Sequence, residues 1–333
     1  MEENYWYKCR FLESSENLKP LVKKRFGREP SSSIAREIAS CLQQGRLFYE
    51  AATSSPLEIR PLQLFYGMLG FSKALIVAHN LRGLSTLKRS HGLIDISADN
   101  SRIADLQIKI LNKGTFQEFN DAVCSLTRVC YTDSSTRPYT ISVPSDVSDR
   151  LSCIKLSLRE ILARIPGLES LYRMTFEEDA LAEPINLATA YQDDTSFRIR
   201  IDDRELFTDR DSLKRIIDRW RSRFPFLNKW RLHSAEHGWG NSIIYFQNAS
   251  NIPDEEFAET HLEYREKMFQ TTAAIDQTLN KFSLQEGLAP LGGGYTGGTW
   301  SISPVGTAHI SEFSLQYLGM FLLSSLIRYR PQI

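Results

Sequence analysis

The chain has no excess of charge of either sign. Among its 333 residues, lysine and arginine together number 40, aspartate and glutamate together number 40, and the formal net charge is zero. A strong positive field around a whole protein is what attracts nucleic acids and anionic membranes, so this composition excludes attraction of that kind. Binding of a polyanion would have to come from a local basic patch.

Cysteine is scarce as well. The chain contains five cysteines, an odd number, and no C-x-x-C motif. A disulfide framework needs a dense, even set of cysteines, and a structural zinc site needs closely spaced pairs. The sequence therefore predicts neither.

Long apolar runs are also missing. The two most apolar stretches, residues 62–77 and 315–327, are interrupted and shorter than the roughly 20 residues that a transmembrane helix needs. The first residues, M-E-E-N-Y-W-Y-K, are acidic and contain no apolar signal core. We therefore expect a cytoplasmic protein without a membrane partner, in which both stretches form buried core helices.

Several motifs that mark enzyme or metal sites are absent or incomplete. No G-x-S-x-G nucleophile elbow occurs, and the glycine-rich run 292–298 lacks the Gly-Lys-Ser/Thr ending of a P-loop, so we expect it to be a mobile loop or a lid. His233, Glu236 and His237 fit the H-x-x-E-H pattern of inverted zinc proteases, but the glycines that follow argue against the required helix. We predict no metal site and no cofactor.

Helical periodicity dominates the first part of the chain. A serine cap at 31–33 and regularly spaced apolar residues predict a helix over 34–52. A second helix is predicted over 61–79, with a proline in its first turn and apolar residues on nearly every side. Gly67 and Gly70 lie inside it and indicate close approach of a neighbouring helix, because glycine destabilises a helix by roughly 1 kcal/mol relative to alanine.

The later patterns predict a mainly α protein with some β structure, of the α+β class. We expect a helical bundle over 1–130 with a short hairpin near 106–119, a loop or linker over 131–150, and a mixed α/β domain over 151–333. The expected elements of the last domain include strands and helices, namely strands over 195–201 and 242–246, a helix capped by Thr208, a long helix over 254–279 and a buried C-terminal helix over 310–329.

Four ordered segments resemble a known family. They are L-F-Y-G-M-L-G-F-S-K-A-L-I at 64–76, H-G-L at 91–93, N-K-G-T-F at 112–116 and S-S-L-I-R-Y-R-P at 324–331. Together they are similar to the YaaC-like proteins in order and overall length, from near the N-terminus to the C-terminus. The resemblance implies a soluble, mostly helical bacterial protein, and it supplies no catalytic residues.

The first half is also loosely similar to helical bundles of the HEPN type, which occur in RNases and in defence or toxin systems. The R-x-x-x-x-H motif of those RNases is absent, since the nearest spacing, Arg231 to His237, is one residue too long. A degenerate site could instead use Arg60, Lys73 and His91, with the imidazole as acid or base near neutral pH.

Two further residues accompany this candidate site. Tyr66 lies seven residues before Lys73 and shares a helical face with it, and Lys113 lies in the N-K-G-T-F turn, so both are candidate binding residues. The alternative is purely structural: Lys73 extends to solvent, Tyr66 hydrogen-bonds a carbonyl and His91 caps a turn.

The segment Thr208–Arg231 is locally basic and rich in aromatic residues. The candidate binding residues there are all arginines, namely Arg215, Arg219, Arg221 and Arg223. Arginines can neutralise phosphates and aromatic rings can stack on bases, so nucleic acid is one possible ligand and an acidic protein is another. Alternatively, the aromatics are core and the arginines are solvated or pair with acids in the two clusters 177–183 and 193–203.

Two functional hypotheses remain from the sequence. The first is an interaction or accessory protein in a bacterial complex, in antiviral defence or stress, with a protein partner or a second copy of the chain. The second is an RNA- or nucleotide-directed enzyme, a degenerate HEPN-like nuclease, with its site around Arg60, Lys73 and His91.

Overall fold

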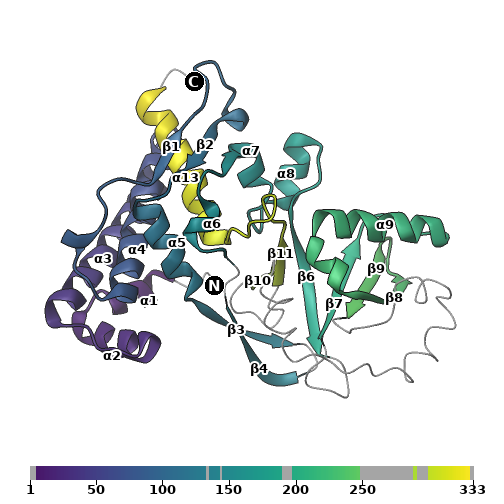
Figure 1. Ribbon diagram of the computed structural model, residues 1–333, viewed down its shortest axis with the longest axis horizontal. Helices are drawn as coiled ribbons and strands as arrows, with labels where there is room; N and C mark the ends of the chain where they lie inside the picture. Colours follow the sequence, from purple (N-terminus) through teal and green to yellow (C-terminus); the bar gives the residue numbers. More distant parts are fainter. Residues whose placement is uncertain are drawn as a thin grey trace. The chain divides into compact units, whose positions relative to one another are not determined.

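A computed structural model describes residues 5–132, 135–142, 145–189, 197–247, 288–290 and 299–330 (Figure 1). The fold is mainly α with smaller β-sheets, as predicted. The chain forms two compact units, each built from separate segments. Unit 1 consists of Met1–Ser125, Asp146–Leu162 and Phe313–Ile333, and unit 2 consists of Leu126–Ser145 and Ala163–Glu312.

Unit 1 is a helical bundle. Its helices are α1 (Tyr5–Leu12), α2 (Ser15–Phe26), α3 (Ser32–Ser54), α4 (Arg60–Asn80), α5 (Thr115–Cys124), the short α6 (Ser148–Leu151) and α7 (Leu158–Leu162), and α13 (Glu312–Tyr329). The predicted serine cap of α3 is confirmed, because the Ser31 Oγ accepts a hydrogen bond from the Ile34 N–H at 3.3 Å. The predicted first-turn proline of α4 is Pro61.

Close packing of α3 against α4 explains the glycines in both helices. A Cβ added to Gly70 would lie 2.9 Å from the Gly45 Cα, and one added to Gly67 would lie 2.6 Å from the Tyr49 ring. Both distances are too short for real Cβ contacts, so the helices approach this closely only because the side chains are missing. The prediction that Gly67 and Gly70 serve helix packing is confirmed.

Among the described residues, α4 is the one helix with the length and apolar composition of a membrane span. Phe65, Ile76 and most of its other apolar residues are buried. The neighbouring helices α3 and α5 pack against it. In this fold α4 is a core helix of unit 1, as the sequence predicts.

The hairpin predicted near 106–119 is wrong. Strand β2 (Gln107–Ile110) pairs instead with β1 (Leu93–Asp95) and with β5 (Lys155–Ser157), and both pairings are antiparallel. The N-K-G-T turn leads into α5, because the apolar residues of F-Q-E-F-N-D-A-V recur at helical rather than strand spacing and become buried.

The C-terminal helix α13 completes the core of unit 1. Ser314 Oγ donates to the Asn120 side-chain oxygen on α5 at 2.8 Å, and Ser325 Oγ donates to Asp95 on β1 at 2.8 Å. Its apolar residues are buried, as predicted. The last helix of the chain therefore belongs to the same unit as the first helices, which differs from the predicted boundary at 151.

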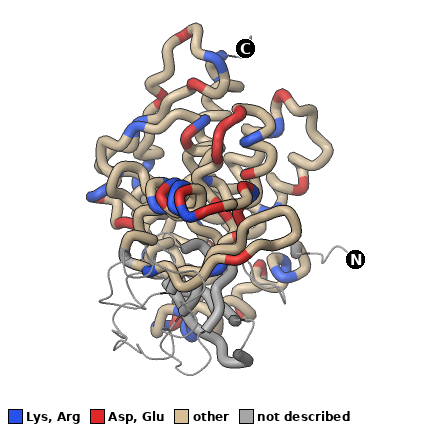
Figure 2. The backbone as a smooth tube through the Cα atoms, turned by 90° about the vertical axis from the view of Figure 1, so that its right-hand side faces the viewer, with Lys and Arg blue, Asp and Glu red and all other residues tan. Residues whose placement is uncertain are grey.

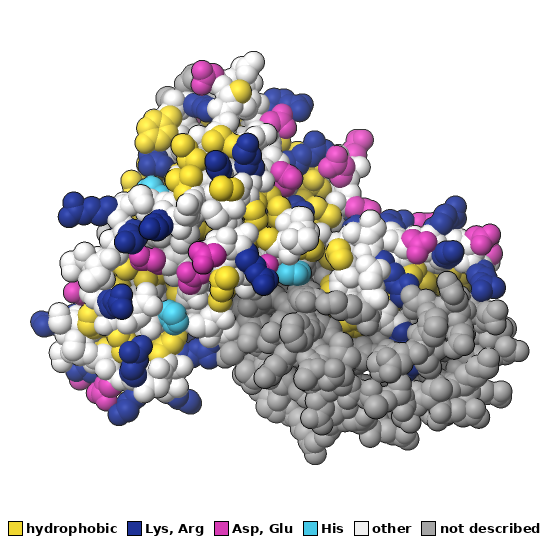
Figure 3. Space-filling model, viewed as in Figure 1, with side chains coloured by type: hydrophobic (Ala, Val, Ile, Leu, Met, Phe, Trp, Pro, Cys, Tyr) yellow, Lys and Arg dark blue, Asp and Glu magenta, His cyan; other side chains and the backbone are white. Residues whose placement is uncertain are grey.

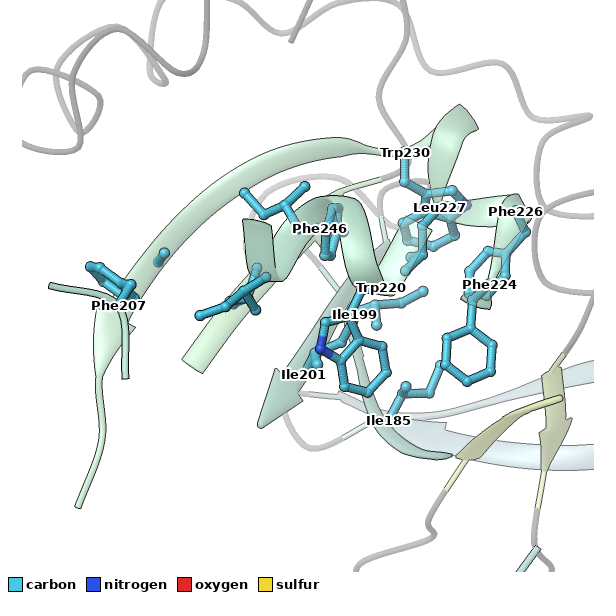
Figure 4. Close-up of a cluster of buried hydrophobic side chains, with 14 residues drawn as sticks. Ile185, Ile199, Ile201, Phe207, Trp220, Phe224, Phe226, Leu227, Trp230 and Phe246 are labelled. Carbon is cyan, nitrogen blue, oxygen red and sulfur yellow. The ribbon is translucent and has the colours of Figure 1, made fainter. Parts of the chain in front are cut away.

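Unit 2 contains a six-stranded sheet in the order β10–β11–β6–β7–β9–β8. The strands are β6 (Ala182–Thr189), β7 (Phe197–Asp203), β8 (Arg231–His237), β9 (Ser242–Gln247), β10 (Leu288–Pro290) and β11 (Thr299–Ile302). Helix α9 (Arg210–Arg223) packs on the sheet, with Trp220 against Ile199, Ile201 and neighbouring apolar side chains (Figure 4). The strands predicted over 195–201 and 242–246 are present as β7 and β9.

Part of the predicted 131–150 loop is a β-hairpin. Strands β3 (Thr127–Thr132) and β4 (Ser135–Ser142) pair antiparallel. The β-branched and aromatic residues of T-R-V-C-Y-T and Y-T-I-S favour strands, and here they outweigh the serine and proline turn signals. The helix predicted over 254–279 and the run 292–298 lie outside the described residues.

Candidate anion site

Two of the recognisable segments meet at the start of α5. The Phe116 N–H donates to the His91 carbonyl oxygen at 3.0 Å, so the turn satisfies one of the N–H groups that begin the helix. A Cβ added to Gly114 would lie 2.2 Å from the Gly92 nitrogen, and Gly92 has a φ of 74°. Only glycines permit this contact, and it fixes the backbone that carries His91.

The His91 imidazole lies half-buried between aromatic rings of two helices. Its centroid is 5.5 Å from the Phe65 ring on α4 and 5.7 Å from the Phe321 ring on α13, both in edge-on geometry. Within the described part of the chain, the imidazole nitrogens have no hydrogen-bond partner. The ring is held in place by packing, which leaves its nitrogens available to a ligand.

Arg328 on α13 contacts the same aromatic ring. Its guanidinium carbon lies 6.0 Å from the Phe65 centroid and 5.2 Å from the Tyr329 centroid. Its Nε donates to the Ser324 carbonyl oxygen at 3.2 Å. Arg328 and His91 therefore lie on one aromatic cluster although they are far apart in the chain.

Lys73 supplies a third basic group to this region. It is half-buried on α4, about two turns after Phe65. Burial lowers the pKa of His91, and the positive charges of Arg328 and Lys73 lower it further. Burial raises the pKa of the Cys41 thiol on α3, an effect that the Lys73 ammonium partly offsets. Lys73 is therefore within electrostatic range of both Cys41 and His91.

No carboxylate among the described residues lies within 4 Å of Lys73, His91 or Arg328. The buried arginine of the same unit is arranged differently: Arg46 Nη1 donates to Glu50 at 2.7 Å, and its Nη2 donates to Glu13 at 2.9 Å. Partly buried charges are normally paired. The basic cluster, defined here as Lys73, His91 and Arg328, thus lacks the acids that the fold supplies to Arg46.

The structure does not bring Arg60 to this cluster. Arg60 lies thirteen residues before Lys73 on α4, which corresponds to about 20 Å along the helix. Its Nη2 donates to the Ser55 carbonyl oxygen at 2.9 Å, near the end of α3. Arg60 therefore ties the α3–α4 turn together.

Tyr66 and Lys113 take different positions. The Tyr66 ring stacks on Phe48 of α3, with centroids 5.5 Å apart, and is partly exposed. Lys113 has an exposed side chain and precedes Gly114, whose backbone touches that of Gly92. Lys113 thus lies on the surface beside the turn that carries His91.

The basic cluster is suited to binding an oxyanion. Lysine ammonium and arginine guanidinium groups donate charge-assisted hydrogen bonds to phosphate, sulfate and carboxylate oxygens. An imidazolium donates two more, and an imidazole can accept or donate a proton near neutral pH. Arg328 was missed as a candidate, although the S-S-L-I-R-Y-R-P segment contains it, because nothing local in the sequence places residue 328 beside residue 91.

Most of the predicted binding arginines of α9 already have hydrogen-bond or ion-pair partners within unit 2. Arg219 donates to Asp203 and to Glu205, each at 2.7 Å, and Arg223 donates to Glu183 at 2.6 Å. The prediction that acids of unit 2 balance the basic helix is confirmed for these pairs. Helix α9 itself carries two acids, Asp211 and Asp218, among its more numerous basic residues (Figure 2).

The remaining two candidate arginines of α9 have different partners and different exposure. Arg221 donates to the Trp230 carbonyl oxygen at 3.0 Å. Arg215 is exposed and lies 3.9 Å from Glu205. The aromatic residues of the same segment are buried in the core, namely Trp220, Phe224, Phe226 and Trp230. Those rings cannot stack on bases in this fold, so the alternative that they are core residues is confirmed.

The H-x-x-E-H pattern lies on a strand. His233 and His237 belong to β8, where four residues span about 13 Å. The His237 Nε2 is 2.7 Å from the Phe207 carbonyl oxygen. The helical geometry that brings both imidazoles of this motif onto one metal is not present here.

One comparison with known proteins supports the family resemblance of the four segments. The model of the YaaC-like protein family matches residues 10–333. No curated protein and no solved structure matches the chain. Because the match covers nearly the whole sequence, this chain belongs to the YaaC-like protein family.

Proposed function

We propose that this protein is an interaction or accessory protein of a bacterial defence or stress complex, and that its helical unit binds a small oxyanion through Lys73, His91 and Arg328. The observation that carries the proposal is that His91 and Arg328 contact the same Phe65 ring, while the charge of Lys73 also acts on His91 and no carboxylate of the described residues lies within 4 Å of the three side chains. A half-buried cationic cluster of this kind is stabilised when an anion occupies it. Ligand binding at the core of the bundle would allow it to act as a sensor.

Small anions fit this cluster better than a long nucleic acid does. On the face shown in Figure 3, the lysines and arginines of the described residues are scattered among acidic and neutral side chains. The α9 arginines that would extend a basic track are mostly paired with acids. A polyanion needs several phosphate contacts along its backbone, whereas one oxyanion needs only the cluster.

Calorimetric titration with inorganic sulfate tests this proposal. We expect Lys73→Gln and Arg328→Gln each to weaken sulfate binding by about tenfold or more, because hydrogen bonds to charged groups contribute about 1.5–3 kcal/mol. The matched control is Lys155→Gln, which removes the same charge from an exposed position on β5 of unit 1. Thermal unfolding of each variant checks that the fold is intact.

An equal change of sulfate affinity in the control and in the cluster variants would contradict the proposal. If Lys155→Gln reduced sulfate affinity as much as Lys73→Gln, the anion would be responding to overall charge. If neither Lys73→Gln nor Arg328→Gln changed the affinity, the cluster would not be the site.

The second hypothesis, an RNA- or nucleotide-directed enzyme, is favoured by one observation. His91, a possible acid or base, is within electrostatic range of two groups that could bind a phosphate. Arg60 is distant, so Arg328 would have to take its role. Turnover of a phosphodiester reporter that disappears in His91→Gln would favour the enzyme, and sulfate binding without turnover would favour the accessory role.

A further inference from the structure

We infer that the basic cluster selects a dianionic group of the phosphate-monoester class, and that His91 takes up one proton when the dianion binds. This inference rests on the proposed function and adds the charge of the ligand and the regulation of the site. The inference is based on the position of His91. Its ring packs edge-on against Phe65 and Phe321 and has no hydrogen-bond partner among the described residues. Arg328 contacts the same Phe65 ring.

The charges around the cluster favour a ligand with two negative charges. Lys73 and Arg328 each carry a positive charge at neutral pH, and no described carboxylate within 4 Å compensates them. For a given protonation state of His91, a monoanion leaves one more positive charge uncompensated than a dianion does. In a partly buried site that remaining charge matters more than it does in water, because the effective dielectric constant is lower.

The charged groups that act on His91 come from two helices. Helix α4 contributes Lys73 and α13 contributes Arg328, and both disfavour a protonated imidazole. Tyr317 of α13 is buried, and burial raises the pKa of its hydroxyl, so it stays neutral. On α5, burial raises the pKa of Glu118, and a backbone hydrogen bond from Lys88 and the positive charge of Lys88 partly oppose this effect. No described acid therefore favours the imidazolium.

A bound dianion has the opposite effect on the pKa of His91. When the site is empty, burial and two cations hold the pKa of His91 below its usual value. A bound dianion compensates the cations and accepts a hydrogen bond from the imidazolium, which raises the pKa of His91. Binding is therefore linked to proton uptake in the pH range between the two values.

The sign of the pH dependence follows from this linkage. Below the pKa of the empty site, His91 is already protonated and the affinity is at its maximum. As pH rises from there to the pKa of the occupied site, the affinity falls by up to about tenfold per pH unit. Above the higher value, the affinity is constant and weak.

The test uses probes whose own charge does not change. Inorganic sulfate is a dianion and methanesulfonate a monoanion throughout pH 5–9, so any pH dependence comes from the protein. Calorimetry with the full-length chain, in buffers of different ionisation enthalpy, gives both the affinity and the number of protons taken up. We expect sulfate to bind at least about tenfold more tightly than methanesulfonate at low pH. Between the pKa of the empty site and that of the occupied site, we expect proton uptake to approach one proton per sulfate.

The matched variant is His91→Gln, which keeps a polar side chain but cannot titrate. It should bind sulfate weakly and equally at all pH values, with no proton uptake. Sulfate binding by the wild-type protein that is independent of pH, or that is no tighter than methanesulfonate binding, would overturn the inference and leave the proposed anion site standing. Sulfate binding that is absent, or unchanged by Lys73→Gln and Arg328→Gln, would overturn both.

Discussion

At the scale of single residues, the partly buried basic groups of this protein fall into two sets. Arg46 in unit 1 and Arg219 and Arg223 in unit 2 are paired with carboxylates. Lys73 and Arg328 have no carboxylate within 4 Å among the described residues. Arg328 contacts the Phe65 ring that also packs against the His91 imidazole, and the charge of Lys73 acts on that imidazole. The first set stabilises the fold, and the second set belongs to the basic cluster that we propose binds an anion.

His91 should make the empty protein less stable in acid. Its pKa in the folded state is lowered, so the unfolded chain binds more protons between that pKa and the usual value near 6.5. The stability that His91 contributes is complete above the usual value and is lost as pH falls from that value to the lowered pKa of the folded state. Urea unfolding from pH 7 to pH 5 should show a larger loss for the wild type than for His91→Gln.

Sulfate provides the control for this comparison. Burial is the main cause of the lowered pKa of His91, and a bound dianion offsets the contribution of the two positive charges, so saturating sulfate should reduce the difference between the two proteins. Parallel curves for wild type and His91→Gln without sulfate would mean that His91 does not titrate in this range.

At the scale of elements, local patterns predicted the long helices and missed pairings between distant segments. The serine cap of α3, the first-turn proline of α4 and its glycines are local signals, and the structure contains each of them. The hairpin near 106–119 was wrong because the partners of β2 are β1 and β5, and β5 lies more than 40 residues later. Strand pairing across such a distance leaves no local mark in one sequence.

The glycine contacts between α3 and α4 give a prediction at this scale. Gly70→Ala should destabilise the protein by roughly 1–3 kcal/mol, because the new methyl group would lie 2.9 Å from Gly45. Gly319→Ala on α13 is the matched control, since a Cβ there would meet Ile161 at 3.5 Å, an ordinary contact.

Chemical denaturation measures both variants. The control should be neutral or more stable by up to roughly 1 kcal/mol, because alanine favours helices over glycine. Equal effects of the two substitutions would show that close approach of the α3 and α4 backbones does not limit the packing there.

At the scale of the whole molecule, the chain returns at its end to the unit where it began. Unit 1 takes α13 from the C-terminus, and with it Arg328, although α4 and the His91 turn come from the first third of the chain. The sequence therefore supplied Lys73 and His91 as candidates but not Arg328, and it grouped them with Arg60, which the structure places elsewhere. The zero net charge likewise does not indicate which basic groups are paired with acids in the fold and which are not.

Location of a bound dianion in crystals tests the central claim most directly. Selenate has the shape and charge of sulfate, and the anomalous scattering of selenium identifies its position. Crystals soaked in selenate should show an anomalous peak within about 4 Å of the Lys73 Nζ, a His91 ring nitrogen and the Arg328 guanidinium, as charge-assisted hydrogen bonding requires. Selenate peaks elsewhere on the protein, with none at this cluster, would contradict the account.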